Sequence, residues 1–294
     1  MYKMKGCIPP MVTPFKENGD LDKESLEKLV SFLSDNVQGL FINGSYGAGA
    51  LMTLEERKEV AEITKKTAGN KVQVVVQVGT TSNRSSAELA SHANSIGVDA
   101  VAAVGPYYYK YNDDSILYFF DDIIKASKGT PVYVYNNPQF QGYPMSLNLI
   151  KRLRDIGVHG IKDATFDIMT HAQYHRILGP DGFDIVLGTE AMWLSACALG
   201  TKAFIPGLAN AFPEINVQMY QEGINGEFDK CRNTQFKINK MRDIMYLAGS
   251  TQLAIYAMLE IRGIIKAYPR APFIPAGEKE KEAIKKELIK LNVL

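Results

Sequence analysis

The sequence has few cysteines and no excess of either charge. Its 294 residues include only Cys7, Cys197 and Cys231, which lie far apart and form no C-x-x-C pair. An odd number of isolated cysteines argues against a disulfide framework and a structural zinc site, so we expect three reduced thiols. The 33 Lys and Arg residues nearly balance the 32 Asp and Glu residues, and no basic cluster is interleaved with aromatics. We therefore expect no nucleic-acid partner.

Long hydrophobic runs are also missing. No stretch of about 18 apolar residues occurs, and the first 15 residues lack the apolar centre of a signal peptide. We expect a cytoplasmic protein with no membrane partner. What is present is an apolar share of 46%, which in a chain of this length can fill a large core.

Short apolar or β-branched runs recur along the chain, with amphipathic helical patterns between them. Eight runs are predicted as strands: residues 6–15, 39–45, 72–80, 100–106, 131–138, 158–164, 183–190 and 202–209. Strands that alternate with helices pair in parallel, because each crossover needs about a dozen residues or more. The sequence therefore predicts an α/β fold, a (β/α)8 TIM barrel.

The alternation stops near residue 222. The remaining chain has helical patterns at 227–247 and 278–291, separated by a segment at 267–278 that contains three prolines and cannot be regular helix. We predict a barrel over residues 1–222 and a C-terminal helical extension over residues 223–294.

Polar side chains close several of the predicted strands. In a barrel of this type the active site lies at the carboxyl ends of the strands. Tyr135 ends the fifth strand and Lys162 the sixth, so both side chains can enter the same opening. Ser45 follows the second strand in a glycine-rich loop whose backbone N–H groups suit a carboxylate. A buried amine is costly unless it is paired or neutralised, so Lys162 indicates either a salt bridge or chemistry.

Each of these residues also has a structural explanation. Lys162 can pair with Asp163, and Tyr135 can be a core tyrosine with a satisfied hydroxyl. The run at 107–109 can be packing or a subunit interface. His171 and His175 have metal-ligand spacing but lack the glutamate of H-E-x-x-H, so we expect no metal site.

The motifs together resemble one known family, the class I, Schiff-base pyruvate aldolases that include N-acetylneuraminate lyase and dihydrodipicolinate synthase. The matching segments cover nearly the whole chain in the family's order: V-T-P-F at 12–15, G-S-Y-G-A-G-A-L-M-T-L-E-E-R at 44–57, G-P-Y-Y-Y-K at 105–110, Y-N-N-P at 135–138 and G-I-K-D-A at 160–164.

The resemblance implies a role for each matching residue. Lys162 would form the Schiff base with a 2-keto acid, Tyr135 would shuttle the proton, and Ser45 with the backbone of Tyr46 would hold the pyruvate carboxylate and relay protons. The backbone around Ile205 would line the pyruvate pocket. Tyr108 would reach the active site of a neighbouring subunit in a homotetramer, a dimer of dimers. The covalent substrate on Lys162 replaces any cofactor.

The amine itself sets a physical requirement. Attack on a ketone needs neutral lysine, whereas free lysine titrates near about 10.4, so the site must disfavour the ammonium form. We expect walls formed by Tyr133, Tyr135 and Ile205 to remove water from Lys162 and so lower its pKa.

Three departures from the family pattern concern the second substrate. Tyr46 and Ala48 replace a threonine and a glutamate of the family's G-T/S-T-G-E loop. Phe140 stands where the lysine-pathway synthase has the arginine that meets its second substrate, which argues against an acidic aldehyde. The remaining departures are positions where sialic-acid lyase has Thr, Asp-Glu and Ser, namely Ala164, Glu190 with Ala191, and Gly207. The resemblance implies that Phe140, Glu190 and Gly207 belong to the substrate-binding site.

The best match is therefore to 2-keto-3-deoxygluconate aldolases, some of which lack the same glutamate and arginine. We predict a lyase that splits a 2-keto-3-deoxy sugar acid, or a related 2-keto acid, into pyruvate and an aldehyde. Four alternatives stay open: 4-hydroxy-tetrahydrodipicolinate synthase, N-acetylneuraminate lyase, a dehydratase or deaminase of the family that uses the same Schiff base, and a non-catalytic barrel that binds a keto acid.

Overall fold

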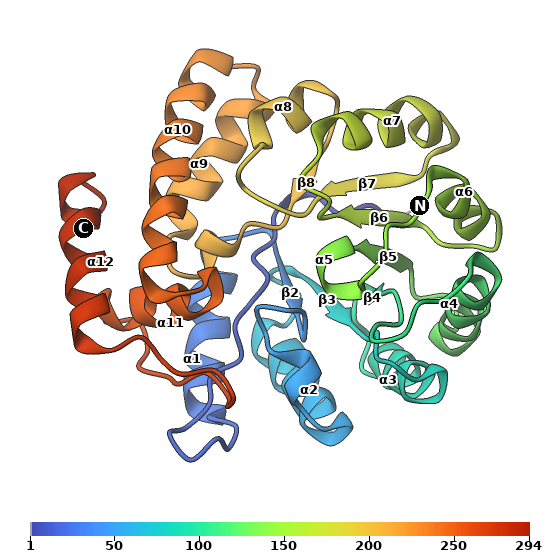
Figure 1. Ribbon diagram of the computed structural model, residues 1–294, viewed down its shortest axis with the longest axis horizontal. Coiled ribbons are helices and arrows are strands. Elements are labelled where there is room, and N and C mark those ends of the chain that lie inside the picture. The colour runs from blue at the N-terminus through green and yellow to red at the C-terminus, as the bar shows by residue number, and fades with distance from the viewer. Residues whose placement is uncertain (1) are drawn as a thin grey trace.

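A computed structural model describes residues 2–294 and contains a closed parallel barrel (Figure 1). Within these residues eight strands pair in the order β1-β8-β7-β6-β5-β4-β3-β2, and an isolated parallel bridge between Pro10 and Phe41 joins the segment after β1 to β2. The strands are β1 (Gly6–Cys7), β2 (Gly39–Ile42), β3 (Gln73–Gln77), β4 (Ala100–Val104), β5 (Val132–Asn136), β6 (Gly160–Asp163), β7 (Asp184–Leu187) and β8 (Ala203–Phe204). Every predicted strand is present, so the (β/α)8 prediction is confirmed.

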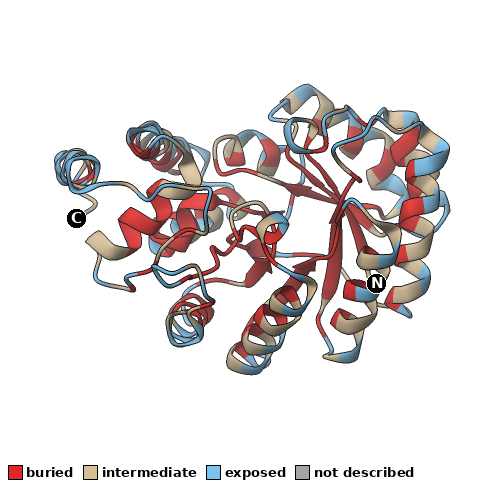
Figure 2. Cartoon of the chain, turned by 60° about the horizontal axis from the view of Figure 1, so that its bottom comes forward, coloured by how far each residue is buried: buried red, intermediate tan, exposed pale blue. Residues whose placement is uncertain are grey.

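Helices surround the barrel and turn one side toward it (Figure 2). In chain order they are α1 (Lys23–Ser34), α2 (Leu54–Ala68), α3 (Asn83–Ser95), α4 (Asp113–Ser127), α5 (Pro138–Gln141), α6 (Leu147–Asp155), α7 (Ile168–Leu178), α8 (Trp193–Ala198), α9 (Pro213–Ile224), α10 (Phe228–Met245), α11 (Thr251–Ile261) and α12 (Glu278–Lys290). Side-chain caps fix several starts, as at α2, where Thr53 and Glu56 form a reciprocal capping box.

Two apolar layers lie on the two faces of the sheet, because successive side chains of a strand point in opposite directions. The larger layer fills the space between strands and helices. The smaller one fills the barrel interior and consists of Met4, Ile8, Phe41, Val75, Ala100, Ala102, Val104, Tyr133, Tyr135, Ala164, Val186, Ala203 and Ile205.

One predicted wall residue lies at the wrong end of the barrel. The Tyr133 hydroxyl donates to Asp184 Oδ2 at 2.7 Å, and Met4 N donates to the same oxygen at 2.9 Å. Asp184 begins β7, so this contact closes the amino-terminal floor. Tyr133 and Tyr135 share a strand face but lie about 7 Å apart along it, which is why alternation alone placed both at the mouth.

The C-terminal helices pack beside the barrel, with α10 next to α9 and α12 at the outer edge (Figure 1). The predicted boundary at residue 222 falls in the last turn of α9, and the proline-containing segment before α12 is irregular as expected. In the described chain, no single helix has the length and apolarity to cross a membrane, although the pair Phe228–Ala248 and Thr251–Ile261, bent by 100°, passes that test on length and composition alone.

Candidate active site

Lys162 lies on the inner face of β6 near its carboxyl end and is 3% exposed. Its Nζ atom lies 3.9 Å from the centroid of the Phe41 ring and 3.7 Å from that of Tyr135. Burial lowers the pKa of Lys162 well below its ordinary value, and no neighbouring carboxylate opposes the shift. The site therefore favours the neutral amine that attack on a ketone requires.

The Tyr135 hydroxyl is the polar group next to this amine. Tyr135 and Lys162 are paired residues of β5 and β6. The Tyr135 hydroxyl lies 3.3 Å from Ser45 Oγ and accepts a hydrogen bond from Asn137 Nδ2 at 3.3 Å. Burial raises the pKa of Tyr135, and the hydrogen bonds from Ser45 and Asn137 oppose this increase. A protonated phenol in contact with a second hydroxyl can pass a proton along the pair.

The loop after β2 offers unused hydrogen-bond donors. Within residues 2–294, the backbone N–H groups of Ser45 and Tyr46 have no protein acceptor, whereas Ala48 N donates to the Ser45 carbonyl at 3.2 Å. Gln252 Nε2 holds the Tyr46 carbonyl at 3.1 Å and so fixes the loop from α11. These two free N–H groups suit the binding of a carboxylate.

Tyr46 and Gly207, two separate departures from the family pattern, are in contact. A Cβ atom at Gly207 would lie 2.6 Å from Tyr46 Cζ and would collide with the hydroxyl. The phenol therefore occupies the volume that a side chain at residue 207 would need. Burial first, and then the charge of Glu190, raise the pKa of Tyr46, while a hydrogen bond with Thr251 lowers it.

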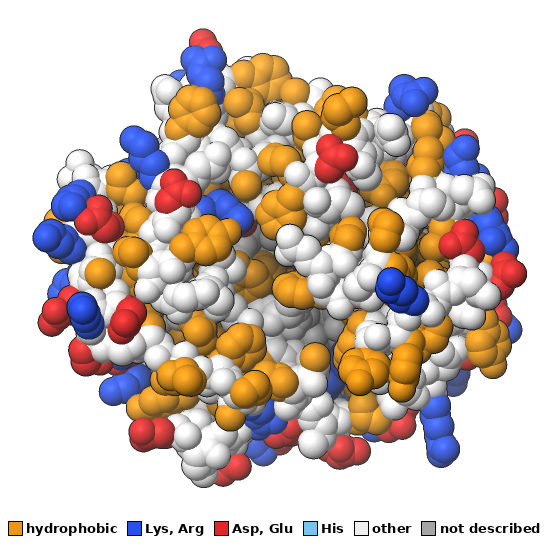
Figure 3. Space-filling model, in the orientation of Figure 1, with side chains coloured by type: hydrophobic (Ala, Val, Ile, Leu, Met, Phe, Trp, Pro, Cys, Tyr) orange, Lys and Arg blue, Asp and Glu red, His pale blue; other side chains and the backbone are white. Residues whose placement is uncertain are grey.

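Lys162 opens into a cavity of about 460 Å³ at the carboxyl ends of the strands. Figure 3 shows a hollow near the centre of this face, bordered by hydrophobic side chains. Its lining includes most of the predicted site residues, namely Ser45, Tyr46, Tyr135, Phe140, Lys162, Glu190, Ile205 and Gly207. An adjoining cavity of about 350 Å³ shares Ser45, Tyr135 and Phe140 with it.

Tyr108 is the one predicted catalytic residue outside this cavity. Its side chain is 85% exposed and its backbone has φ +82°, in the left-handed region. Tyr107 lines the adjoining cavity in its place. The protomer alone therefore assembles Lys162, Tyr135 and Ser45, and the role of Tyr108 in a neighbouring subunit stays a prediction.

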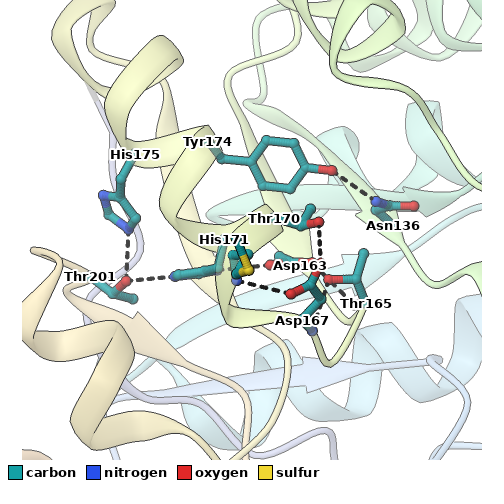
Figure 4. A network of polar contacts seen from close by, with 10 residues as sticks. Asn136, Asp163, Thr165, Asp167, Thr170, His171, Tyr174, His175 and Thr201 are labelled. Carbon is teal, nitrogen blue, oxygen red and sulfur yellow. Dashed lines mark hydrogen bonds and ion pairs between the residues drawn. The ribbon is translucent and has the colours of Figure 1, made fainter.

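The two histidines with metal-ligand spacing are engaged in a protein network (Figure 4). His171 Nδ1 lies 2.8 Å from Asp163 Oδ2, and Thr201 Oγ1 lies 2.8 Å from both His171 Nε2 and His175 Nε2. Burial first, and then His171, lower the pKa of His175 to about 4. Among the described residues no group of three His, Cys, Asp or Glu side chains could hold a metal ion.

Several residues that contact Lys162 or line the cavity were not identified from the sequence. Phe41 carried a signal, because strand alternation places it inside the barrel with Gly39. Arg242 and Thr251 carried none, since they belong to the C-terminal helices and resemble ordinary surface residues of amphipathic helices. Only the packing of α10 and α11 against the barrel brings them to the cavity.

Comparisons with known proteins identify the family of the chain. A model of the dihydrodipicolinate synthetase family matches residues 3–291. A 4-hydroxy-tetrahydrodipicolinate synthase from Fervidobacterium nodosum is 30% identical, covering 98% of this chain and 99% of its own. An N-acetylneuraminate lyase from Salmonella paratyphi A is 30% identical, covering 96% and 95%. The structure of YagE from E. coli K12, a dihydrodipicolinic acid synthase family protein in complex with pyruvate, superposes with a TM-score of 0.93 at 26% identity and covers 99% of each chain.

These matches extend over the whole barrel and its C-terminal helices, and they confirm the resemblance drawn from the sequence motifs. They leave the non-catalytic barrel without support and do not distinguish the 2-keto-3-deoxygluconate aldolase type. The chain is a pyruvate-dependent lyase with an aldolase site, and it belongs to the dihydrodipicolinate synthetase family, together with the N-acetylneuraminate lyases.

Proposed function

We propose that this lyase cleaves a 2-keto-3-deoxy sugar acid, or a related 2-keto acid, to pyruvate and an aldehyde through a Schiff base on Lys162. The observation that carries the proposal is a buried amine with no ionic partner, held between two aromatic rings beside the Ser45–Tyr135 hydroxyl pair. Such a group costs folding stability, and a buried ionisable group without a partner at the edge of a cavity is typical of a functional site.

The reaction begins at the keto carbon. Neutral Lys162 attacks C2, and the keto oxygen leaves as water once Tyr135 has supplied a proton, which leaves an iminium cation. The free N–H groups of Ser45 and Tyr46 hold the carboxylate on C1, which places C2 against the amine.

Cleavage of the C3–C4 bond follows. The C4 hydroxyl loses its proton to Tyr135, which gave up its own proton in the first step, and the C3–C4 electron pair moves toward the iminium as the bond breaks. The Tyr135–Ser45 pair holds this proton for the later protonation at C3. The aldehyde departs and a neutral enamine remains. Protonation at C3 and attack by water then release pyruvate and restore the Lys162 amine.

The charges that line the cavity favour a neutral second half of the substrate. Its charged side chains are Lys162, Arg242 and Glu190, and the last two form an ion pair with 2.8 Å between Arg242 Nη1 and Glu190 Oε1. The iminium balances the C1 carboxylate, so a second carboxylate would be left without a counter-charge. Phe140 adds no cation, which disfavours an acidic aldehyde.

A second candidate is 4-hydroxy-tetrahydrodipicolinate synthase, the name of several relatives. It would use the same Schiff base in the direction of condensation. The homotetramer with Tyr108 entering a neighbouring site, the absence of a cofactor and the cytoplasmic location remain parts of our proposal.

The test is pyruvate release, measured by a coupled reductase assay, from 2-keto-3-deoxy sugar acids, N-acetylneuraminate and 4-hydroxy-2-oxoglutarate. Condensation of pyruvate with aspartate semialdehyde is assayed in parallel, and borohydride-trapped protein is analysed by peptide mass spectrometry. We expect cleavage of a sugar acid and a pyruvate adduct on Lys162. Condensation without cleavage of any sugar acid would overturn the proposal in favour of the synthase.

A further inference from the structure

Arg242 comes from outside the barrel and has N–H donors without an acceptor among the described residues. It lies on α10 and lines the same cavity as Lys162, with its side chain 15% exposed. Its Nη1 atom pairs with Glu190, whereas Nε and Nη2 have no hydrogen-bond acceptor within residues 2–294. The planar guanidinium therefore presents free N–H groups on a fixed frame.

Glu190 keeps that frame in place and is itself fully engaged. Its Oε2 accepts from Gly207 N at 3.1 Å, and its Oε1 accepts from Leu208 N at 3.4 Å as well as facing Arg242. Gln235, also on α10, donates to the Glu190 carbonyl at 2.8 Å. With its carboxylate committed and 1% exposed, Glu190 is a counter-ion for Arg242 and leaves substrate binding to the arginine.

We propose that Arg242 is the specificity-determining residue that binds hydroxyl groups on the substrate chain beyond C4. This inference rests on the proposed function. The C1 to C3 end of the substrate is held by Ser45, Tyr46 and Lys162, so the remaining chain extends into the rest of the cavity. There the free donors of a charge-neutral ion pair match hydroxyl oxygens, since hydrogen bonds to them need no further counter-charge.

The test removes the planar guanidinium of Arg242 and keeps its positive charge. Arg242→Lys retains a cation for Glu190 but removes the planar set of donors. Arg232→Lys is the matched control, because Arg232 lies on the same helix, is half exposed and, among residues 2–294, forms its salt bridge with Asp229 one turn away. Thermal melting of each variant reports whether the fold is kept.

We expect Arg242→Lys to raise KM for a 2-keto-3-deoxy sugar acid by about 10- to 100-fold, with kcat changed much less, since hydrogen bonds to a charged donor are lost. KM for 4-hydroxy-2-oxopentanoate, which has no distal hydroxyl, and borohydride trapping of pyruvate should equal those of wild type. Equal KM increases for both substrates would assign Arg242 a merely structural role and overturn the inference.

A binding measurement separates this inference from the proposed function. The sugar acid competes with pyruvate for Lys162, so the concentration that halves the trapped pyruvate adduct reports binding without cleavage. If wild type binds but does not cleave, the proposed function fails, while a rise of about tenfold in that concentration for Arg242→Lys still supports the inference. Equal concentrations for both proteins, or no competition in wild type, would overturn it.

Discussion

Lys162 and Asp163 are adjacent residues of β6 that bury ionisable groups on opposite faces of one strand. Lys162 points into the barrel, where it meets two aromatic rings and, within the described part of the chain, no ionic partner. Asp163 points outward, where both carboxylate oxygens accept hydrogen bonds, Oδ1 from Thr165 and Oδ2 from His171. Both residues are nearly inaccessible, at 3% and 2% exposure. Burial alone therefore does not indicate function, whereas burial without a partner does.

The hydrogen bonds that link Asp163, His171, Thr201 and His175 on the outer side of β6 can all run in one direction (Figure 4). If His175 donates from Nε2 to Thr201, and Thr201 donates to His171 Nε2, then His171 donates from Nδ1 to Asp163. Every hydrogen and acceptor along this path is used once. Such a path ties α7 and the segment before β8 to the back of β6, and so holds the strand that carries Lys162.

Replacing Lys162 should have the largest effect, because this residue differs from Asp163 in having no ionic partner among the described residues. Lys162→Met should abolish cleavage of every 2-keto acid, because no other amine lines the cavity among the described residues. The same variant should unfold at an equal or higher temperature, since it removes a buried amine without a partner. Pyruvate release and thermal melting measure the two effects. Residual turnover at the wild-type rate would contradict the assignment of the nucleophile.

Tyr135 tests the proton path on the same face. Tyr135→Phe retains the ring against Lys162 Nζ and removes the hydroxyl that contacts Ser45. We expect kcat to fall by about 10²- to 10⁴-fold, the usual contribution of a general acid and base. Steady-state kinetics measure this, and Tyr143→Phe is the control, since its hydroxyl donates instead to the Pro106 carbonyl at 2.9 Å. A fall of equal size in both variants would argue against proton transfer by Tyr135.

Replacing Asp163 should change the stability of the fold and not the catalysed reaction. Asp163→Leu leaves His171 and Thr165 without an acceptor and should destabilise the fold by about 3 kcal/mol. Asp163→Asn should cost less than about 1 kcal/mol, because the new amide can donate to His171 Nδ1 and the whole path can reverse toward the partly buried His175. Chemical denaturation measures both. Equal losses would show that the negative charge, and not the hydrogen-bond path, is what the fold requires.

The sequence predicted the inner face well because strand alternation is local. The spacing of Tyr135 and Lys162 at two strand ends was sufficient to place both at the mouth, and the register of β5 with β6 confirms it. The same rule misplaced Tyr133, because alternation gives the face but not the height along the barrel.

Contacts between distant segments could not be predicted. Tyr46 and Gly207 appeared in the sequence as two unrelated departures from the family. In the structure, however, the Tyr46 side chain fills the space that a side chain at residue 207 would need. Arg242 reaches the cavity only because α10 packs beside the barrel, and the helical pattern carries no information about that neighbour. Pairings of this kind depend on tertiary packing, which no single stretch of sequence encodes.

The buried amine should also make the stability of the fold depend on pH. Folding lowers the pKa of Lys162 below its ordinary value of 10.5, so between these two values the unfolded chain binds more protons than the folded one. The stability of wild type must therefore rise with pH across this window, relative to Lys162→Met, and the difference between the two should become constant above about 10.5. Denaturation at a series of pH values checks the sign. A difference that stayed constant with pH would mean that Lys162 keeps its proton equally in both states, and the contrast with Asp163 would then lose its physical basis.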